Sequence, residues 1–241
     1  HRMMATFVGF ITLMQAVLLG FSDQPKWIIK LGYISLILVI TQGILGGITV
    51  LYFLPPVISI IHGILAQTFF LFTILIAYGL SSERTNREDS GYTKSLRKIS
   101  FIIISMVYIQ LILGALTRHT ASGLAIPDFP TMGGLWIPTF SESMINNINV
   151  MLFDLDLDMI ERYQVIIHFS HRLGAFIITF TIGYFFVRYK NIIKEYHHIY
   201  KTFIFFSVIL LVQLSLGILT VLSERSPYIA SFHVLTGAAL L

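Results

Sequence analysis

Four histidines occupy duplicated places in the sequence and are the residues best suited to chemistry. His1-Arg2 recurs as His171-Arg172, and each pair is followed 61 or 62 residues later by another histidine, His62 or His233. Imidazole is the commonest side-chain ligand of metal ions in proteins. Two histidines on facing helices can supply both axial ligands of a six-coordinate haem iron, whereas zinc would favour a tighter cluster of three protein ligands. The paired arrangement therefore favours haem.

The stretch that leads to each later histidine is also duplicated. Residues 42–51 read Gln-Gly-Ile-Leu-Gly-Gly-Ile-Thr-Val-Leu, residues 213–222 read Gln-Leu-Ser-Leu-Gly-Ile-Leu-Thr-Val-Leu, and a proline follows each, at Pro56 and Pro227. Glutamine, glycine and threonine at this spacing share one face of a helix. Gln110, Gly114 and Thr117 form a third copy. Such a stripe either packs helices closely through small and polar residues or contacts a bound cofactor, and both interpretations stay open.

The composition places these residues in a membrane. Hydrophobic residues make up 56% of the 241 residues and charged residues only 12%, about half of the roughly 25% that is usual in soluble domains. A membrane-spanning helix needs about 20 apolar residues. Seven apolar runs predict helices near residues 3–20, 30–53, 57–80, 99–117, 162–187, 202–222 and 228–241. We therefore expect an all-α integral membrane protein. The absence of cysteine excludes disulfides and iron–sulfur clusters.

Basic residues are concentrated in alternate loops, at 26–30, 84–98 and 188–201. Short basic loops face the cytoplasm, so the intervening loops, including the acidic run 154–158, are expected outside. This distribution accounts for the net charge of +4 and indicates no nucleic-acid partner. In this orientation all four repeated histidines fall in the outer half of the membrane. We expect them to form one layer there.

The longest loop joins two halves of the chain. It spans residues 118–160 and contains turn-forming glycines and prolines. We interpret it as an extracytoplasmic connection that caps the outer face. The N-terminal helix-bundle half is then 1–117 and the C-terminal half is 161–241. Because the chain opens on His1 and its last apolar run is short, we expect it to be part of a longer protein.

The remaining candidate residues are less decisive. A lone membrane histidine usually joins helices through a hydrogen bond, but four at duplicated positions favour ligation. Arg2 and Arg172 either bind haem propionates or extend toward the membrane interface. His197 and His198 lie in a basic inner loop and are interpreted as surface residues. The roles of His119 and His168 stay open, although His168 shares a helix face with His171.

Taken together, these motifs resemble the haem A synthase family over nearly the whole chain. The resemblance rests on His1-Arg2, residues 45–51 leading to His62, residues 118–130 (Arg-His-Thr-Ala-Ser-Gly-Leu-Ala-Ile-Pro-Asp-Phe-Pro), His171-Arg172, and residues 216–222 leading to His233. It implies two pseudo-symmetric four-helix halves, of which seven helices are visible and an eighth is expected before His1.

The resemblance also implies an activity and a set of ligands. The family oxidises the C8 methyl of haem O to a formyl group, giving haem A, through successive hydroxylations and loss of water. His171 and His233 would be the axial ligands of a haem b cofactor, with Arg172 beside it. His1 and His62 would line or ligate the haem O site, with Arg2 nearby. Haem O synthase and an unidentified electron donor would be partners in the bacterial plasma membrane, and a homo-oligomer is left open.

Two departures from the family pattern concern residues near these sites. The family carries a glutamate three residues before the first histidine, a position that precedes His1. Ile126 stands where a cysteine often precedes Pro127-Asp128, which removes a redox role there.

Three functions other than haem O oxidation are also compatible with some of these features. A dihaem b-type membrane cytochrome that only passes electrons stays open as the alternative, although it would normally place its haems on opposite sides of the membrane. A haem O synthase would need aspartate-rich sites on the inner side, and a transporter with inverted repeats does not fit a parallel repeat.

Overall fold

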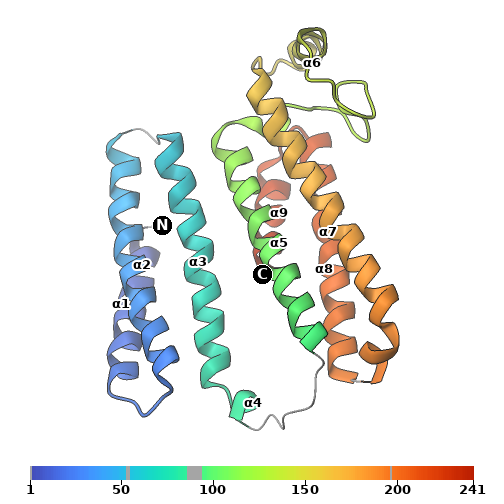
Figure 1. Ribbon diagram of the computed structural model, residues 1–241. Coiled ribbons are helices and arrows are strands. Elements are labelled where there is room, and N and C mark those ends of the chain that lie inside the picture. Colours follow the sequence, from blue (N-terminus) through green and yellow to red (C-terminus); the bar gives the residue numbers. More distant parts are fainter. Residues whose placement is uncertain (1, 53–54, 86–93, 196) are drawn as a thin grey trace. The chain divides into compact units, whose positions relative to one another are not determined.

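The computed structural model describes residues 2–52, 55–85, 94–195 and 197–241, and the described chain is helical almost throughout (Figure 1). Outside the helices, the described residues contain one isolated bridge between Met132 and Leu135. The chain divides into two compact units, His1–Tyr92 and Thr93–Leu241. The predicted all-α class is confirmed. The predicted boundary at residue 117 divides the chain by its repeat and stays a prediction.

The first unit is built from consecutive antiparallel helices. Its elements are α1 (Arg2–Gly20), α2 (Lys26–Leu51), α3 (Pro56–Leu80) and the short α4 (Ser82–Thr85). Helix α2 packs against both α1 and α3, and Leu19, Ile28 and Ile76 form a small core between them. A Cβ on Gly79 would lie 2.9 Å from Ile28 Cδ1. Glycine at this position therefore lets α3 approach α2 closely.

The second unit is organised around its longest helix. Its elements are α5 (Lys94–His119), the 3₁₀ turn η1 (Ser122–Leu124), α6 (Glu142–Asp154), α7 (Arg162–Glu195), α8 (His197–Leu222) and α9 (Pro227–Ala239). Helix α7 packs against α5 and α8, and α8 packs against α9. Their shared core includes Val107, Ile178 and Leu210.

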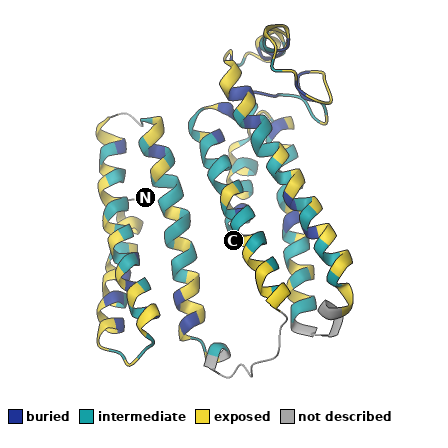
Figure 2. Cartoon of the chain, in the orientation of Figure 1, coloured by how far each residue is buried: buried dark blue, intermediate teal, exposed yellow. Residues whose placement is uncertain are grey.

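Six of the described helices are long and apolar enough to cross a membrane: α1, α2, α3, α5, α7 and α8. Exposed positions run along these helices (Figure 2). They include large apolar residues such as Phe7, Phe101 and Phe180, which is expected where lipid replaces water. The protein is thus an integral membrane protein. The seventh predicted segment is also helical, but α9 has 13 residues and a length of about 20 Å, less than the ~30 Å of a hydrocarbon core.

The observed helices extend beyond several predicted boundaries. Helix α5 begins at Lys94 and α7 continues to Glu195, because charged residues such as lysine, arginine and glutamate are good helix formers although they end an apolar run. The duplicated prolines have a local role. Pro56 and Pro227 stand in the first turns of α3 and α9, where the missing N–H costs no hydrogen bond.

The segment interpreted as a loop contains a helix of its own. Helix α6 buries Met144, Ile148 and Leu152 in a core that also includes Ile126 and Val165. This is the periodicity of an amphipathic helix, so the segment 118–160 is not a loop throughout.

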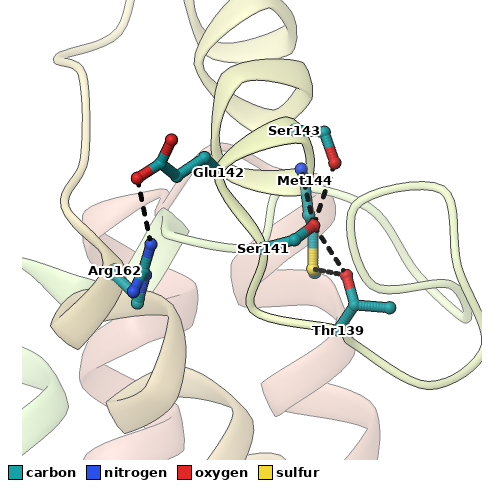
Figure 3. A network of polar contacts seen from close by, with 6 residues as sticks. All are labelled: Thr139, Ser141, Glu142, Ser143, Met144 and Arg162. Atoms are coloured by element: carbon teal, nitrogen blue, oxygen red, sulfur yellow. Dashed lines mark hydrogen bonds and ion pairs between the residues drawn. The ribbon is translucent and has the colours of Figure 1, made fainter.

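Polar contacts hold the start of α6 (Figure 3). The Ser141 hydroxyl caps the helix by accepting from the Met144 backbone N–H at 3.3 Å. The carboxylate of Glu142 lies 3.7 Å from the Arg162 guanidinium at the start of α7. Both members of this ion pair are more than half exposed, so it adds little stability, and the apolar core is the main attachment of α6.

Candidate functional site

Two of the repeated histidines face each other in the second unit. The ring centroids of His171 on α7 and His233 on α9 lie 6.4 Å apart, with an angle of 87° between the ring planes. Two imidazoles bound at about 2.0–2.1 Å on opposite sides of one metal ion would have centroids about 6.3 Å apart. The same geometry also occurs in ordinary edge-to-face ring contacts. The atoms around each ring therefore decide between the two interpretations.

Each of these rings is contacted through the same nitrogen. His171 Nδ1 lies 3.1 Å from Gln110 Nε2 on α5, and His233 Nδ1 lies 3.2 Å from the backbone carbonyl oxygen of Gln213 on α8. A ligating histidine usually donates the N–H of the nitrogen that does not bind the metal to an acceptor. The Gln213 carbonyl oxygen is such an acceptor for His233, whereas the Gln110 amide nitrogen is a donor to His171. The described contacts of both rings thus engage Nδ1 rather than Nε2.

Glycine provides the space for each ring. A Cβ built on Gly114 would lie 3.3 Å from His171 Cε1, and one built on Gly217 would lie 3.1 Å from His233 Cε1. Both distances are shorter than ordinary carbon–carbon contacts. The glycine of each Gln-to-Thr stripe therefore lies beneath an imidazole from the neighbouring helix.

The first unit contains a third example of the same arrangement. A Cβ on Gly46 of α2 would lie 3.6 Å from Cε1 of His62 on α3, and Gln42 Nε2 donates to the His62 carbonyl oxygen at 2.7 Å. One polar contact is missing here. His62 Nδ1 is buried and has no hydrogen-bond partner among the described residues.

The structure thus gives the stripe a role that sequence reasoning left open. In each copy the stripe contacts a histidine from the next membrane helix along the chain. In the copies that begin at Gln42 and Gln213, the contacting histidine follows the glutamine by 20 residues, as the repeat suggests. In the copy that begins at Gln110, the histidine follows by 61 residues, because the loop that contains α6 intervenes. The sequence offers no signal for that pairing.

Arg172 holds the outer loop to α7. Its Nη2 donates to the Ile126 carbonyl oxygen at 2.8 Å, and its Nη1 donates to those of Asp128 and Thr131 at 3.0 and 3.4 Å. The predicted contact with haem propionates stays a prediction. What the structure shows is that the residue next to His171 binds three backbone carbonyls of the loop.

His168 takes part in the same attachment. The Ile126 N–H lies 3.1 Å from its Nδ1 and Arg172 Nε lies 3.2 Å from its Nε2. A neutral imidazole has one acceptor nitrogen, so only one of these contacts is a hydrogen bond at a time. His168, which is 4% exposed, is therefore a buried residue that connects α7 to the loop.

The loop itself is folded around a carboxylate. Asp128 accepts hydrogen bonds from the backbone N–H groups of Gly133 at 2.7 Å and Gly134 at 2.9 Å. Partial burial alone would raise the pKa of Asp128, but the hydrogen bonds from Thr131, Gly134 and Gly133 outweigh it and hold the pKa below its usual value. Asp128 is thus ionised at neutral pH and fixes the turn that Arg172 binds.

Some of the other predicted residues are outside the described structure. His1 and the side chains of His197 and His198 are outside the described residues, and Arg2 is exposed at the start of α1. His119 is half-buried as the last residue of α5. The single layer of four histidines stays a prediction.

The described residues fit a haem iron better than a zinc ion. They contain no group of three or more histidine, cysteine, aspartate or glutamate side chains placed to hold a metal, whereas a bis-imidazole haem needs only two. His171 and His233 offer their Nε2 atoms, and Gly114 and Gly217 leave the rings their space.

A family model and individual similar proteins point to the same family. A model of the COX15-CtaA family, described as "Cytochrome oxidase assembly protein", matches residues 1–241. Proteins named "Heme A synthase" align with all of this chain: one from Rickettsia prowazekii (strain Madrid E) is 28% identical and one from Rickettsia akari (strain Hartford) is 30% identical, each with 70% of its length covered. A third, from Pelagibacter ubique (strain HTCC1062), is 27% identical with 68% covered.

Proposed function

Because the chain belongs to the COX15-CtaA family of cytochrome oxidase assembly proteins, we propose that it oxidises the C8 methyl group of haem O to a formyl group by successive hydroxylation, with haem b as its bound cofactor. Its relatives named haem A synthase identify it as an enzyme of haem A biosynthesis. The specific reaction and the cofactor are the proposal.

The observation that carries the proposal is the His171–His233 pair. The centroid separation of 6.4 Å and the contacts at both Nδ1 atoms support a site in which the two rings would hold one iron through their Nε2 atoms. Haem b bound there would supply one-electron redox chemistry, while the protein orients the group and tunes its electronics. In this assignment His171 and His233 are the ligands, and Gln110 and the Gln213 backbone hold their rings.

His62, together with His1, is assigned to the haem O substrate. The His62 ring rests over Gly46 as the other two rings rest over their glycines. Its buried Nδ1 has no partner among the described residues, so this ring keeps hydrogen-bonding capacity for a molecule that enters and leaves. That difference supports a substrate role for the N-terminal site and a cofactor role for the C-terminal pair.

The cellular setting is part of the same proposal. The basic residues of alternate loops favour an orientation with those loops in the cytoplasm and the histidine sites toward the outer face. Since the similar proteins are bacterial, we assign the protein to the bacterial plasma membrane. Haem O synthase would supply the substrate, and a separate donor would supply electrons.

The test is to identify the haems that accumulate when the protein is expressed in membranes of a host that makes haem O. Haems are extracted and separated by chromatography for the wild type and for His62→Ala. We expect haem A with the wild type and haem O without haem A with His62→Ala. If the wild type yields two equivalents of haem b and never haem A, the protein is a dihaem cytochrome and the proposal fails.

A further inference from the structure

The side-chain amide of Gln110 is satisfied at one end only. Its Nε2 lies 3.1 Å from His171 Nδ1 and 2.7 Å from the His171 carbonyl oxygen. Its Oε1 is buried and has no hydrogen-bond partner among the described residues. A Cβ on Gly174, one turn beyond His171, would collide with this oxygen. Helix α7 therefore has a glycine where the amide needs room.

This arrangement suits one tautomer of His171. Because Nε2 of the amide is a donor, His171 Nδ1 must accept, and the proton of the neutral ring then resides on His171 Nε2. A ring that binds iron through Nε2 needs the opposite tautomer, with the proton on Nδ1. The Nδ1–H group would then point at the Gln110 amide and would need an acceptor.

Gln110 Oε1 is the acceptor placed to meet that need. Half a turn about the last side-chain bond exchanges Oε1 and Nε2, since the two ends of a primary amide have nearly the same shape. The exchange gives up the bond to the His171 carbonyl, so the amide must also move away from that oxygen, which keeps the helix N–H groups as donors. It leaves the amide Nε2 without a described acceptor in place of Oε1, and its gain is the hydrogen bond to Nδ1–H, a buried donor whose lack of a partner would cost about 1–3 kcal/mol.

We infer that Gln110 is a positioning residue for His171, and that its amide turns over when His171 becomes an iron ligand, so that Oε1 accepts from Nδ1–H. The inference rests on the proposed role of His171 as a haem b ligand. A hydrogen bond accepted from Nδ1–H makes the imidazole a stronger donor to the iron. Gln110 therefore stabilises the ferric form and lowers the reduction potential of the bound haem.

The other ligand provides an internal control. His233 Nδ1 faces the backbone carbonyl oxygen of Gln213, which no side-chain substitution removes. The Gln213 side chain instead accepts a hydrogen bond from Thr236 Oγ1. Gln213 and Gln110 occupy matching positions of the repeat, so the same substitution at each perturbs packing in a similar way and differs in its effect on the ring.

The experiment compares the reduction potential of haem b in the purified protein for the wild type, Gln110→Leu, Gln110→Glu and Gln213→Leu. We expect Gln110→Leu to raise the ratio of reduced to oxidised haem at a fixed potential about tenfold, which is about 59 mV for one electron. Gln213→Leu should change it less than twofold. Gln110→Glu, which keeps an acceptor oxygen in either protonation state, should have a potential at or below that of the wild type.

The outcomes separate this inference from the proposed function. Equal shifts in Gln110→Leu and Gln213→Leu, or a raised potential in Gln110→Glu, overturn the role of Gln110 while leaving the haem b assignment intact. If Gln110→Leu does not retain haem, the reduction potential of Gln110→Glu tests the inference instead: a value at or below that of the wild type supports it, and a higher value overturns it. A wild type without haem b overturns the assignment instead.

Nitrogen NMR of the haem-free protein, labelled at histidine, gives a second readout. It should show the His171 proton on Nε2 in the wild type and on Nδ1 in Gln110→Glu. A proton on Nδ1 in both proteins contradicts the inference without reference to haem.

Discussion

The N-terminal histidine site and the C-terminal pair use the same construction but hold their rings differently. His62, His171 and His233 each lie over a glycine of the preceding repeat helix. In the C-terminal pair a polar group from that helix also contacts Nδ1, whereas His62 Nδ1 has no such partner among the described residues. The glycine supplies a place for the ring and the second contact fixes its orientation. We interpret the fixed rings as suited to a resident cofactor and the less constrained ring as suited to a substrate.

Removing a proposed histidine ligand should have the largest effect of these substitutions. The result should differ between the N-terminal histidine site and the C-terminal pair. We expect His233→Ala to lose the proposed haem b, because only one of the two histidines that would hold it remains. His62→Ala should retain haem b and lose only haem A formation. Absorption spectra of the purified variants measure this, and a full b-type spectrum in His233→Ala would refute the ligand assignment.

The two arginines that follow histidines in the repeat should also differ. Arg172→Leu removes three contacts to loop carbonyls, and a hydrogen bond to a charged group contributes about 1.5–3 kcal/mol. We expect a lower thermal unfolding temperature and faster proteolytic cleavage within residues 126–161. Arg2→Leu, at an exposed position of α1, should change neither. If Arg172→Leu releases haem while the loop stays resistant to protease, the propionate contact is the better description.

Replacing the glycine beneath a histidine ring with alanine should affect the two sites differently, because the rings lie at different distances from the added methyl group. Gly217→Ala places a Cβ 3.1 Å from His233 Cε1, whereas Gly46→Ala places one at an ordinary 3.6 Å from His62 Cε1. The first should tilt a ligand ring and speed transfer of haem b to an acceptor protein about tenfold, which corresponds to the low end of the ~10–100-fold loss of affinity that follows when the support of a ligand is disturbed. The second should leave that rate unchanged. Equal rates in both variants would mean that the closer packing at Gly217 has no consequence.

The smallest expected effect is a pH dependence confined to the outer loop. The pKa of Asp128 is below its usual value in the folded protein, so its contribution to stability is complete above the unfolded pKa of about 3.9 and is lost as pH falls through the lower folded value. Protease sensitivity of the loop should rise below about pH 4 and lose this dependence in Asp128→Asn. Residues 52–55, which connect α2 and α3, contain no carboxylate, so that connection should show no such change.

The helices and the repeated pairs were accessible from the sequence because apolar length and residue spacing are local signals. The Gln-Gly-Thr stripe was recognised as a helix face, and the glycine–histidine contacts at Gly46 and Gly217 follow the repeat directly. The pairing of Gln110 with His171 was not accessible, because the two are separated by a loop whose path depends on its own core. Helix α6 does have a sequence pattern that predicts a helix, namely a Ser141 cap followed by apolar residues at 144, 148 and 152.

The partner of Arg172 could not be predicted from the sequence for a different reason. A cation next to a predicted ligand suggests an anionic partner, but the described structure satisfies it with backbone carbonyls of residues 126–131. Residue type alone cannot distinguish these partners, since both present acceptor oxygens. Only the folded loop, turned around Asp128, supplies them.

The different chain separations of the three glutamine–histidine contacts set an order for their formation. Two of the contacts close over 20 residues within a single helical hairpin, while the third closes over 61 residues. Loop-closure entropy makes the longer one less favourable by about 1 kcal/mol, and contacts between distant residues form later in folding. The hairpins α2–α3 and α8–α9 can therefore form their contacts without the rest of the chain. The Gln110–His171 contact also requires the outer loop to close, so the ring of this proposed ligand is fixed by a contact that a single helical hairpin cannot provide.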